Sequence, residues 1–310
     1  MRAQAFPLRL SASAPGLDSH RHPPPPNNSF KPTPHRGVNS MLCATLARCR
    51  RHAVGRLNSS VRSAPTMIPI DVEKSFGDFI RIFGGEVLED TYGSSLQIKN
   101  ADYVFRDPPV IGELKRLVEN HNESNTIQEK IQSKLDKWIS DGTIRNIYGE
   151  PIIQSNTLPE MCQRELIDLY KPNLQKRVLK ANKQIKETKT LLGLEQAKGV
   201  LFVANDGNYA LEADAALYLI GRILCTSCHS INSVVYFTAN MYTLNPSTTL
   251  PALVWANVSR KNVADPVDGD FLMKLCDGWR NHVSLLRNDL ISRIDSDFTN
   301  IGQARYLKQT

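Results

Sequence analysis

Long hydrophobic runs are missing from this 310-residue sequence. Its best apolar runs, such as 199–204, have the length of one strand, whereas a membrane-spanning helix needs about 20 consecutive apolar residues. Cysteine is also scarce, because six residues at irregular positions do not form a disulfide framework. No secretory signal is recognisable upstream, so we expect a reduced, cytoplasmic protein with no membrane partner.

The motifs of several large enzyme classes are absent. The sequence contains no G-x-x-x-x-G-K-[ST], no G-x-G-x-x-G, no H-E-x-x-H and no G-x-S-x-G string. These absences argue against a nucleotide-driven motor, a dinucleotide oxidoreductase, a zinc protease and a serine hydrolase.

Acidic residues are nearly absent from residues 1–66, which hold ten Lys or Arg and one acid, Asp18. The rest of the chain carries 28 basic and 30 acidic side chains, so the net charge of +7 comes from this first segment. It is rich in proline and has no sustained periodicity, and we expect it to be disordered. It fits a basic nucleic-acid-binding arm, a transit peptide or translated sequence upstream of the natural start. We favour the last, with Met67 as the initiator.

Residues 67–310 alternate between helical and strand patterns. Apolar residues at helical spacing over 71–83 predict a first helix, and three extended segments follow, the last over 110–114. Further elements are expected in this order: helices 127–139 and 159–192, strand 199–204, helix 211–224, strands 233–239 and 252–258, and helix 269–291. The alternation predicts an α/β domain with a long helical insertion at about 120–195.

The sharpest chemical pattern is Asp102 followed by Glu113-Leu114-Lys115. On a strand, Glu113 and Lys115 project to one face while Leu114 faces the core. A turn at 108–109 could bring Asp102 back beside Glu113. Two carboxylates and an ammonium group on adjacent strands suit a Mg²⁺ or Mn²⁺ site that acts on a phosphodiester. The alternative is a solvated strand face, with Asp102 as a turn acid.

This arrangement resembles the PD-(D/E)xK nuclease superfamily, whose restriction-endonuclease-like fold is a mixed sheet core flanked by helices. Family members place a helix before three strands, with the Asp on the second strand and the (D/E)-x-K on the third, followed by a helix and another strand. On this resemblance Asp102 and Glu113 bind the metal, and Lys115 orients or activates the attacking water. Many members add an acid from the first helix, for which Glu73 is the first candidate and Asp78 the second.

The sequence departs from the family pattern in two places. Ala101 stands where the family name has Pro, which is a common loss, and about 80 residues separate Lys115 from the strand at 199–204, far more than in a minimal core. The resemblance covers 70–118 closely and 199–239 only by pattern. It implies a nuclease acting on DNA, with RNA as the other candidate substrate, and a homodimer if both strands are cut. The alternative is a non-catalytic nucleic-acid-binding or interaction module with the same fold.

Positive charge in the body is concentrated between 171 and 189, where seven Lys or Arg accompany one acid and give a local charge of +6. Lys176, Lys180 and Lys183 recur at i, i+4 and i+7 and, with Arg177, could follow nucleic-acid phosphates. A solvated helix face is the alternative.

Two polar residues, Asn205 and Asp206, directly follow the apolar strand 199–204. Ligands of open α/β sheets usually bind at the carboxyl ends of strands, so these residues could lie near a substrate. A plain turn is the alternative, because Asn, Asp and Gly are the residues that turns prefer.

The segment 225–229, Cys-Thr-Ser-Cys-His, matches the C-x-x-C-H pattern of c-type haem attachment. Haem attachment requires export, for which no signal is recognisable. A zinc site would need a second pair of ligands, and only the distant Cys162, Cys276 and His282 are available. We therefore expect a helix terminus with two half-buried thiols.

Overall fold

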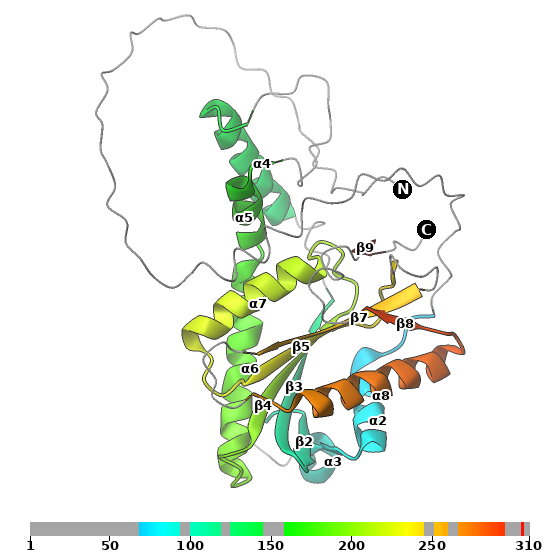
Figure 1. Ribbon diagram of the computed structural model, residues 1–310. Helices are drawn as coiled ribbons and strands as arrows, with labels where there is room; N and C mark the ends of the chain where they lie inside the picture. Colours follow the sequence, from blue (N-terminus) through cyan, green and yellow to red (C-terminus); the bar gives the residue numbers. More distant parts are fainter. Residues whose placement is uncertain are drawn as a thin grey trace, which may run out of the picture.

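The computed structural model describes residues 68–93, 100–118, 125–144, 158–244, 251–259, 266–294 and 305–306. They form a mixed sheet flanked by helices, which confirms the α/β prediction (Figure 1). The predictions for residues 1–66 and for the extended stretch within 94–99 lie outside the described residues. None of the described helices is both long enough and apolar enough to span a membrane.

The described strands form a sheet in the order β1-β2-β3-β4-β5-β7-β6-β9, and β8 pairs with β7. β1, β2 and β3 are antiparallel neighbours, β4 and β5 run parallel to β3, and β7 is antiparallel to β5. The strands are β1 (Glu86–Val87), β2 (Tyr103–Arg106), β3 (Pro109–Leu117), β4 (Lys198–Asn205), β5 (Ser233–Thr238), β6 (Thr243–Leu244), β7 (Pro251–Ser259), β8 (Ser292–Ile294) and β9 (Arg305–Tyr306).

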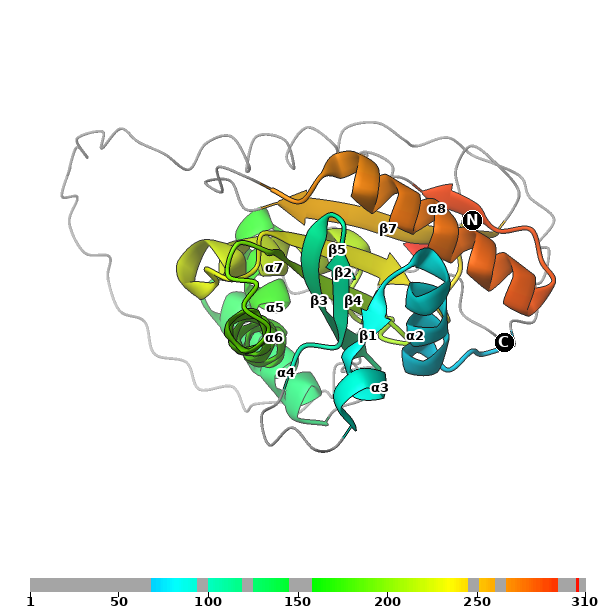
Figure 2. The ribbon, with the colours of Figure 1, turned by 90° about the horizontal axis from the view of Figure 1, so that it is seen from below.

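One face of the sheet is covered by helices α2 (Val72–Phe83) and α8 (Gly269–Arg287), as Figure 2 shows. The Asp71 side chain caps the start of α2 by accepting from Lys74 N, and Gly84, with φ 94°, ends the helix in the left-handed region that glycine favours. Phe76 stacks against Phe237 with ring centroids 5.2 Å apart. Phe76 also packs against Tyr103 of β2 and Phe202 of β4, so this aromatic core holds α2 against the sheet.

The opposite face is covered by α6 (Lys171–Leu191) and α7 (Ala213–Ser227). α6 is the crossover between the parallel strands β3 and β4 and packs against both. Helices α4 (Asn125–Ser140) and α5 (Glu160–Asp168) instead share a separate apolar cluster around Trp138 and extend away from the sheet (Figure 1). Of the helices expected to form an insertion at about 120–195, α6 is therefore part of the layer that covers the sheet.

Three element boundaries differ from the prediction. The helix expected over 159–192 is interrupted between α5 and α6, because Pro172 at the start of α6 has no N–H to continue the helix. The chain after β1 turns into the short helix α3 (Leu88–Tyr92) instead of staying extended. α8 ends at Arg287, since Asn288 adopts a left-handed conformation with φ 49°.

Gly199 on β4 should be intolerant of any side chain. A Cβ at this position would collide with the backbone carbonyl oxygen of Ser230, which cannot move as a flexible side chain would. We expect Gly199→Ala to lower the free energy of unfolding by about 3 kcal/mol. Gly221→Ala is the matched control, because Gly221 lies within α7 with nothing within 4 Å of its Cβ position and should be neutral or stabilising by up to about 1 kcal/mol. Urea denaturation of both variants tests this, and equal effects would contradict it.

Candidate functional site

The three residues of the nuclease-like pattern meet where β2 separates from β3. Asp102 N–H donates to the Gly112 carbonyl oxygen at 3.1 Å, and Tyr103 also pairs with Gly112, so two consecutive residues lie opposite one. The Asp102 carboxylate then accepts a hydrogen bond from Leu114 N–H, with 2.7 Å between Oδ2 and N. This carboxylate therefore lies beside the β3 backbone at Glu113–Leu114, in the position that a neighbouring strand would occupy.

Glu113 is fully buried, with an exposed fraction of 0%. Its Oε1 forms an ion pair with the Lys115 ammonium group, while its Oε2 is buried and has no hydrogen-bond partner among the described residues. Burial, reinforced by the charge of Asp102, raises the pKa of Glu113 to about 8, against the opposing effect of Lys115. The charge of Lys115 alone therefore does not compensate for the burial of the ionised Glu113 carboxylate.

The Asp102 carboxyl group is in a similar environment. Burial raises its pKa, and the Leu114 N–H and the Lys115 charge only partly oppose this effect. Two carboxyl groups with raised pKa values therefore act on each other, and the charge of Lys115 lowers the pKa of both. A divalent cation would favour the charged form of both.

Gln184 on α6 completes the surroundings of Lys115. Lys115 Nζ lies 3.1 Å from Gln184 Oε1, and Gln184 Nε2 donates to the Asn100 carbonyl oxygen at 2.8 Å. Gln184 is not among the site residues predicted from the sequence. The sequence holds one sign of its role: Gln184 is a polar residue on the apolar, buried face of α6, next to Ile185.

Helix α2 does not place an acidic side chain together with Asp102 and Glu113 as a third metal ligand. Glu73 has a side chain that is 70% exposed and lies 3.7 Å from an Arg116 nitrogen. Its charge raises the pKa of Asp102, so it is an electrostatic neighbour of the pair. Asp78 forms ion pairs with Lys74 and Arg81. Within the described ranges, no cluster of three or more Asp, Glu, His or Cys side chains could hold a metal ion.

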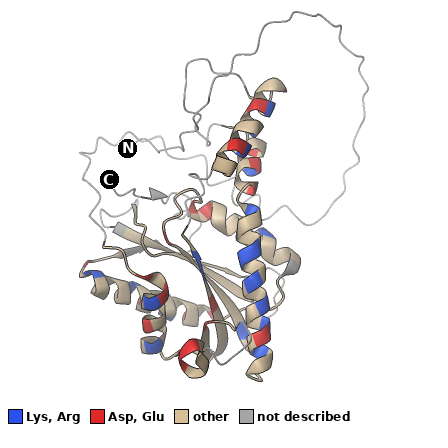
Figure 3. Cartoon of the chain, turned by 180° about the vertical axis from the view of Figure 1, so that it is seen from behind, with Lys and Arg blue, Asp and Glu red and all other residues tan. Residues whose placement is uncertain are grey.

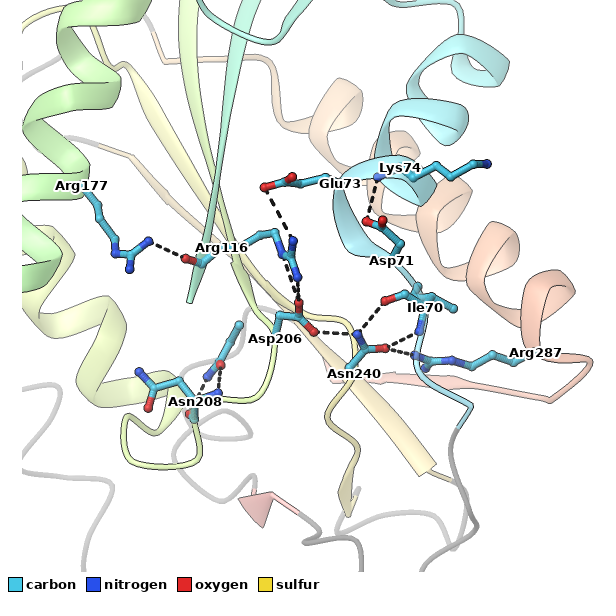
Figure 4. A network of polar contacts seen from close by, with 11 residues as sticks. Ile70, Asp71, Glu73, Lys74, Arg116, Arg177, Asp206, Asn208, Asn240 and Arg287 are labelled. Atoms are coloured by element: carbon cyan, nitrogen blue, oxygen red, sulfur yellow. Dashed lines mark hydrogen bonds and ion pairs between the residues drawn. The ribbon is translucent and has the colours of Figure 1, made fainter. Parts of the chain in front are cut away.

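Asp206 belongs to a separate polar network at the carboxyl ends of β3, β4 and β5 (Figure 4). Its Oδ2 lies 2.6 Å from Arg116 Nη2, and its Oδ1 accepts from Asn240 at 2.6 Å. Asn240 in turn bonds to the backbone of Ile70 and to Arg287. The network joins the start of α2 and the end of α8 to the sheet.

Asn205 is fully buried. Its side-chain nitrogen donates to the Tyr236 hydroxyl at 2.8 Å and to the Asn208 carbonyl oxygen at 3.1 Å, and its side-chain oxygen accepts from Asn208 N. The side chain stabilises the loop after β4 from within, which matches the turn alternative.

The basic residues of α6 divide into two groups. Lys176, Lys180 and Lys183 are exposed, and Lys and Arg recur along α6 in Figure 3. The charge of Lys180 lowers the pKa of Glu113, so this lysine lies near the acidic pair. Arg177 instead forms hydrogen bonds within the protein: it donates to the Arg116 carbonyl oxygen at 3.0 Å and to the Asn173 side chain at 3.4 Å.

The C-x-x-C-H segment lies at the end of α7. Cys225 is exposed, but Cys228 is buried, and a covalent bond from its sulfur to a haem would require this region to open. Cys162 and Cys276 belong to two different apolar clusters. The described cysteines therefore do not gather into one zinc site.

Comparisons with models of protein families, with curated proteins and with solved structures give no match for this chain.

Proposed function

We propose that this protein is a metal-dependent nuclease that hydrolyses phosphodiester bonds in DNA. The observation that carries the proposal is that the Asp102 carboxylate bonds to the backbone N–H of Leu114, between Glu113 and Lys115, where its charge acts on the Glu113–Lys115 ion pair. The order of α2, the antiparallel β1-β2-β3, α6 and the parallel β4 supports membership of the restriction-endonuclease-like fold. RNA is the other polynucleotide that this chemistry would accept.

The two carboxylates fit a Mg²⁺ or Mn²⁺ ion. Mg²⁺ in proteins is usually bound by one or two carboxylates, with water and substrate phosphate completing the shell, so Asp102 and Glu113 suffice. Glu113 offers a buried oxygen without a hydrogen-bond partner among the described residues. Asp102 uses Oδ2 on Leu114 N–H, and no hydrogen bond joins its Oδ1 to another described residue. When bound, the cation supplies positive charge to the phosphodiester as negative charge develops on it.

Lys115 is placed to act on the attacking water. Its ammonium group is held between Glu113 and Gln184, which fixes its position at the acidic pair. A positioned ammonium group beside a carboxylate can orient a water molecule toward phosphorus and stabilise the charge that forms. Gln184 acts through Lys115 as a positioning residue.

The remaining parts of the proposal concern partners and location. Exposed lysines of α6 would bind the nucleic-acid backbone next to the acidic pair. We further propose that the protein acts in the cytoplasm and pairs as a homodimer if it cuts both strands.

The proposal is tested by incubating the full chain with labelled DNA in Mg²⁺, in Mn²⁺ and in EDTA. We expect cleavage in both metals, none in EDTA, and a loss of at least about 100-fold in rate for Asp102→Asn. Asp90→Asn is the matched control, because Asp90 is an exposed acid paired with Arg81. Absence of metal-dependent cleavage by the wild-type protein, or full activity of Asp102→Asn, would contradict the proposal.

A non-catalytic nucleic-acid-binding module is the second candidate. It is favoured by the complete burial of Glu113 and its ion pair with Lys115, an arrangement that also suits a purely structural role. This candidate predicts salt-dependent DNA binding that is unchanged by EDTA, with no cleavage.

A further inference from the structure

Among the described helices, only α6 carries a large excess of basic side chains. α6 carries seven basic and one acidic side chain, whereas α4 and α5 together carry four basic and five acidic ones. On the other side, α7 carries one of each sign. A duplex presents the phosphates of two strands, and among these helices only α6 carries a large excess of positive charge that would neutralise them.

The exposed lysines of α6 form a single row. Lys176, Lys180 and Lys183 lie within about 60° of one another around the helix, at separations of about 6 Å and about 4.5 Å along its axis. Successive phosphates of one strand in B-form DNA advance by about 3.4 Å along the axis, and by more in an extended strand. A single row of lysines suits the phosphates of one strand better than those of two strands on opposite sides of a groove.

One member of the row lies near an acid that is beneath the surface. Lys180 is the member whose charge reaches Glu113, and Gln184, one turn further along α6, contacts Lys115. Glu113 has no exposed surface, and the Lys115 side chain is 16% exposed. A rigid duplex contacts only exposed groups, whereas an unpaired strand can bend closely around a side chain that is 16% exposed, such as Lys115.

We infer that the substrate is an unpaired polynucleotide strand, whose backbone lies along the Lys176–Lys180–Lys183 row and reaches the acidic pair next to Lys180. The inference rests on the proposed function, because it takes nucleic acid as the substrate. It adds that a single strand, or the unpaired end of a duplex, is bound in preference to continuous duplex.

Binding in EDTA tests the inference without hydrolysis. Fluorescence anisotropy would compare a short labelled single strand with the blunt duplex of the same sequence, and with the RNA strand of that sequence. We expect the DNA or RNA single strand to bind at least about tenfold more tightly than the duplex. Lys180→Ala should weaken single-strand binding about fivefold and reduce the salt-dependence slope by about 0.7.

Lys186→Ala is the matched control, because Lys186 is exposed on the same helix but lies about 120° around it from Lys180. Equal or tighter binding of the duplex, or equal effects of the two substitutions, would overturn the inference. Failure of the proposed function would look different: the single strand would be bound preferentially and never cut in Mg²⁺. Cleavage of closed circular duplex as fast as single strand would overturn the inference and leave the proposed function standing.

Discussion

Replacing Glu113 with glutamine is expected to slow Mg²⁺-dependent cleavage by about a thousandfold while the protein stays folded. Glutamine has the shape of the protonated acid and keeps an oxygen for the Lys115 ammonium group, so packing is preserved. It cannot take a negative charge, and the metal would lose one of its two protein carboxylates. Cleavage of labelled DNA gives the rate, and circular dichroism reports the fold.

The matched control for this substitution is Glu86→Gln. Glu86 is an exposed strand residue that pairs with Arg106, and its replacement should leave the cleavage rate unchanged. If Glu113→Gln kept more than about a tenth of the wild-type rate, Glu113 would not be a metal ligand. A loss of activity in both variants would show that the assay reports folding instead of chemistry.

The second large effect concerns stability as a function of pH. The pKa of Glu113 is raised from an ordinary value of 4.5 to about 8 in the folded protein, so between these values the folded state binds a proton that the unfolded state has lost. Stability due to this group is present in full below the ordinary value and is lost as pH rises toward 8. Without metal, the free energy of unfolding should fall by up to about 4 kcal/mol across this window.

Urea denaturation in EDTA at several pH values between about 5 and about 8 measures this dependence. Glu113→Gln should remove most of the slope, because glutamine does not titrate, and should be more stable than the wild type at the upper end of the range. Parallel pH profiles for the two proteins would contradict the raised pKa of Glu113.

Most of the secondary structure follows from local periodicity. The first helix, β3, β4 and α7 were predicted within a few residues, since each has an uninterrupted apolar pattern and a clear stop signal. The break between α5 and α6 depends on Pro172 alone, within a pattern that otherwise continues on both sides. The helical pattern on both sides of Pro172 is long enough to hide a break that one residue causes.

The candidate site was only partly predictable for a different reason. Asp102 and Glu113 are close in sequence, and one hairpin joins them. Gln184 is 69 residues from Lys115, and Arg177 is 61 residues from Arg116, so both contacts depend on where α6 crosses the sheet. Glu73 was expected at the metal, but Arg116 offers it an opposite charge on the other face. The sequence alone does not show that Arg116 lies close enough to Glu73 to attract it away from the metal position.

Beyond Gly112, no described strand pairs with the edge of β3 on the side of β2, which has a consequence for self-association. Asp102 accepts from Leu114 N–H and Arg177 donates to the Arg116 carbonyl oxygen, so two side chains block groups that an incoming strand would use. Loss of either side chain would leave an open template for strand addition by another copy of the chain. We therefore expect the Asp102 carboxylate to hinder strand addition at this edge, whether or not it binds a metal.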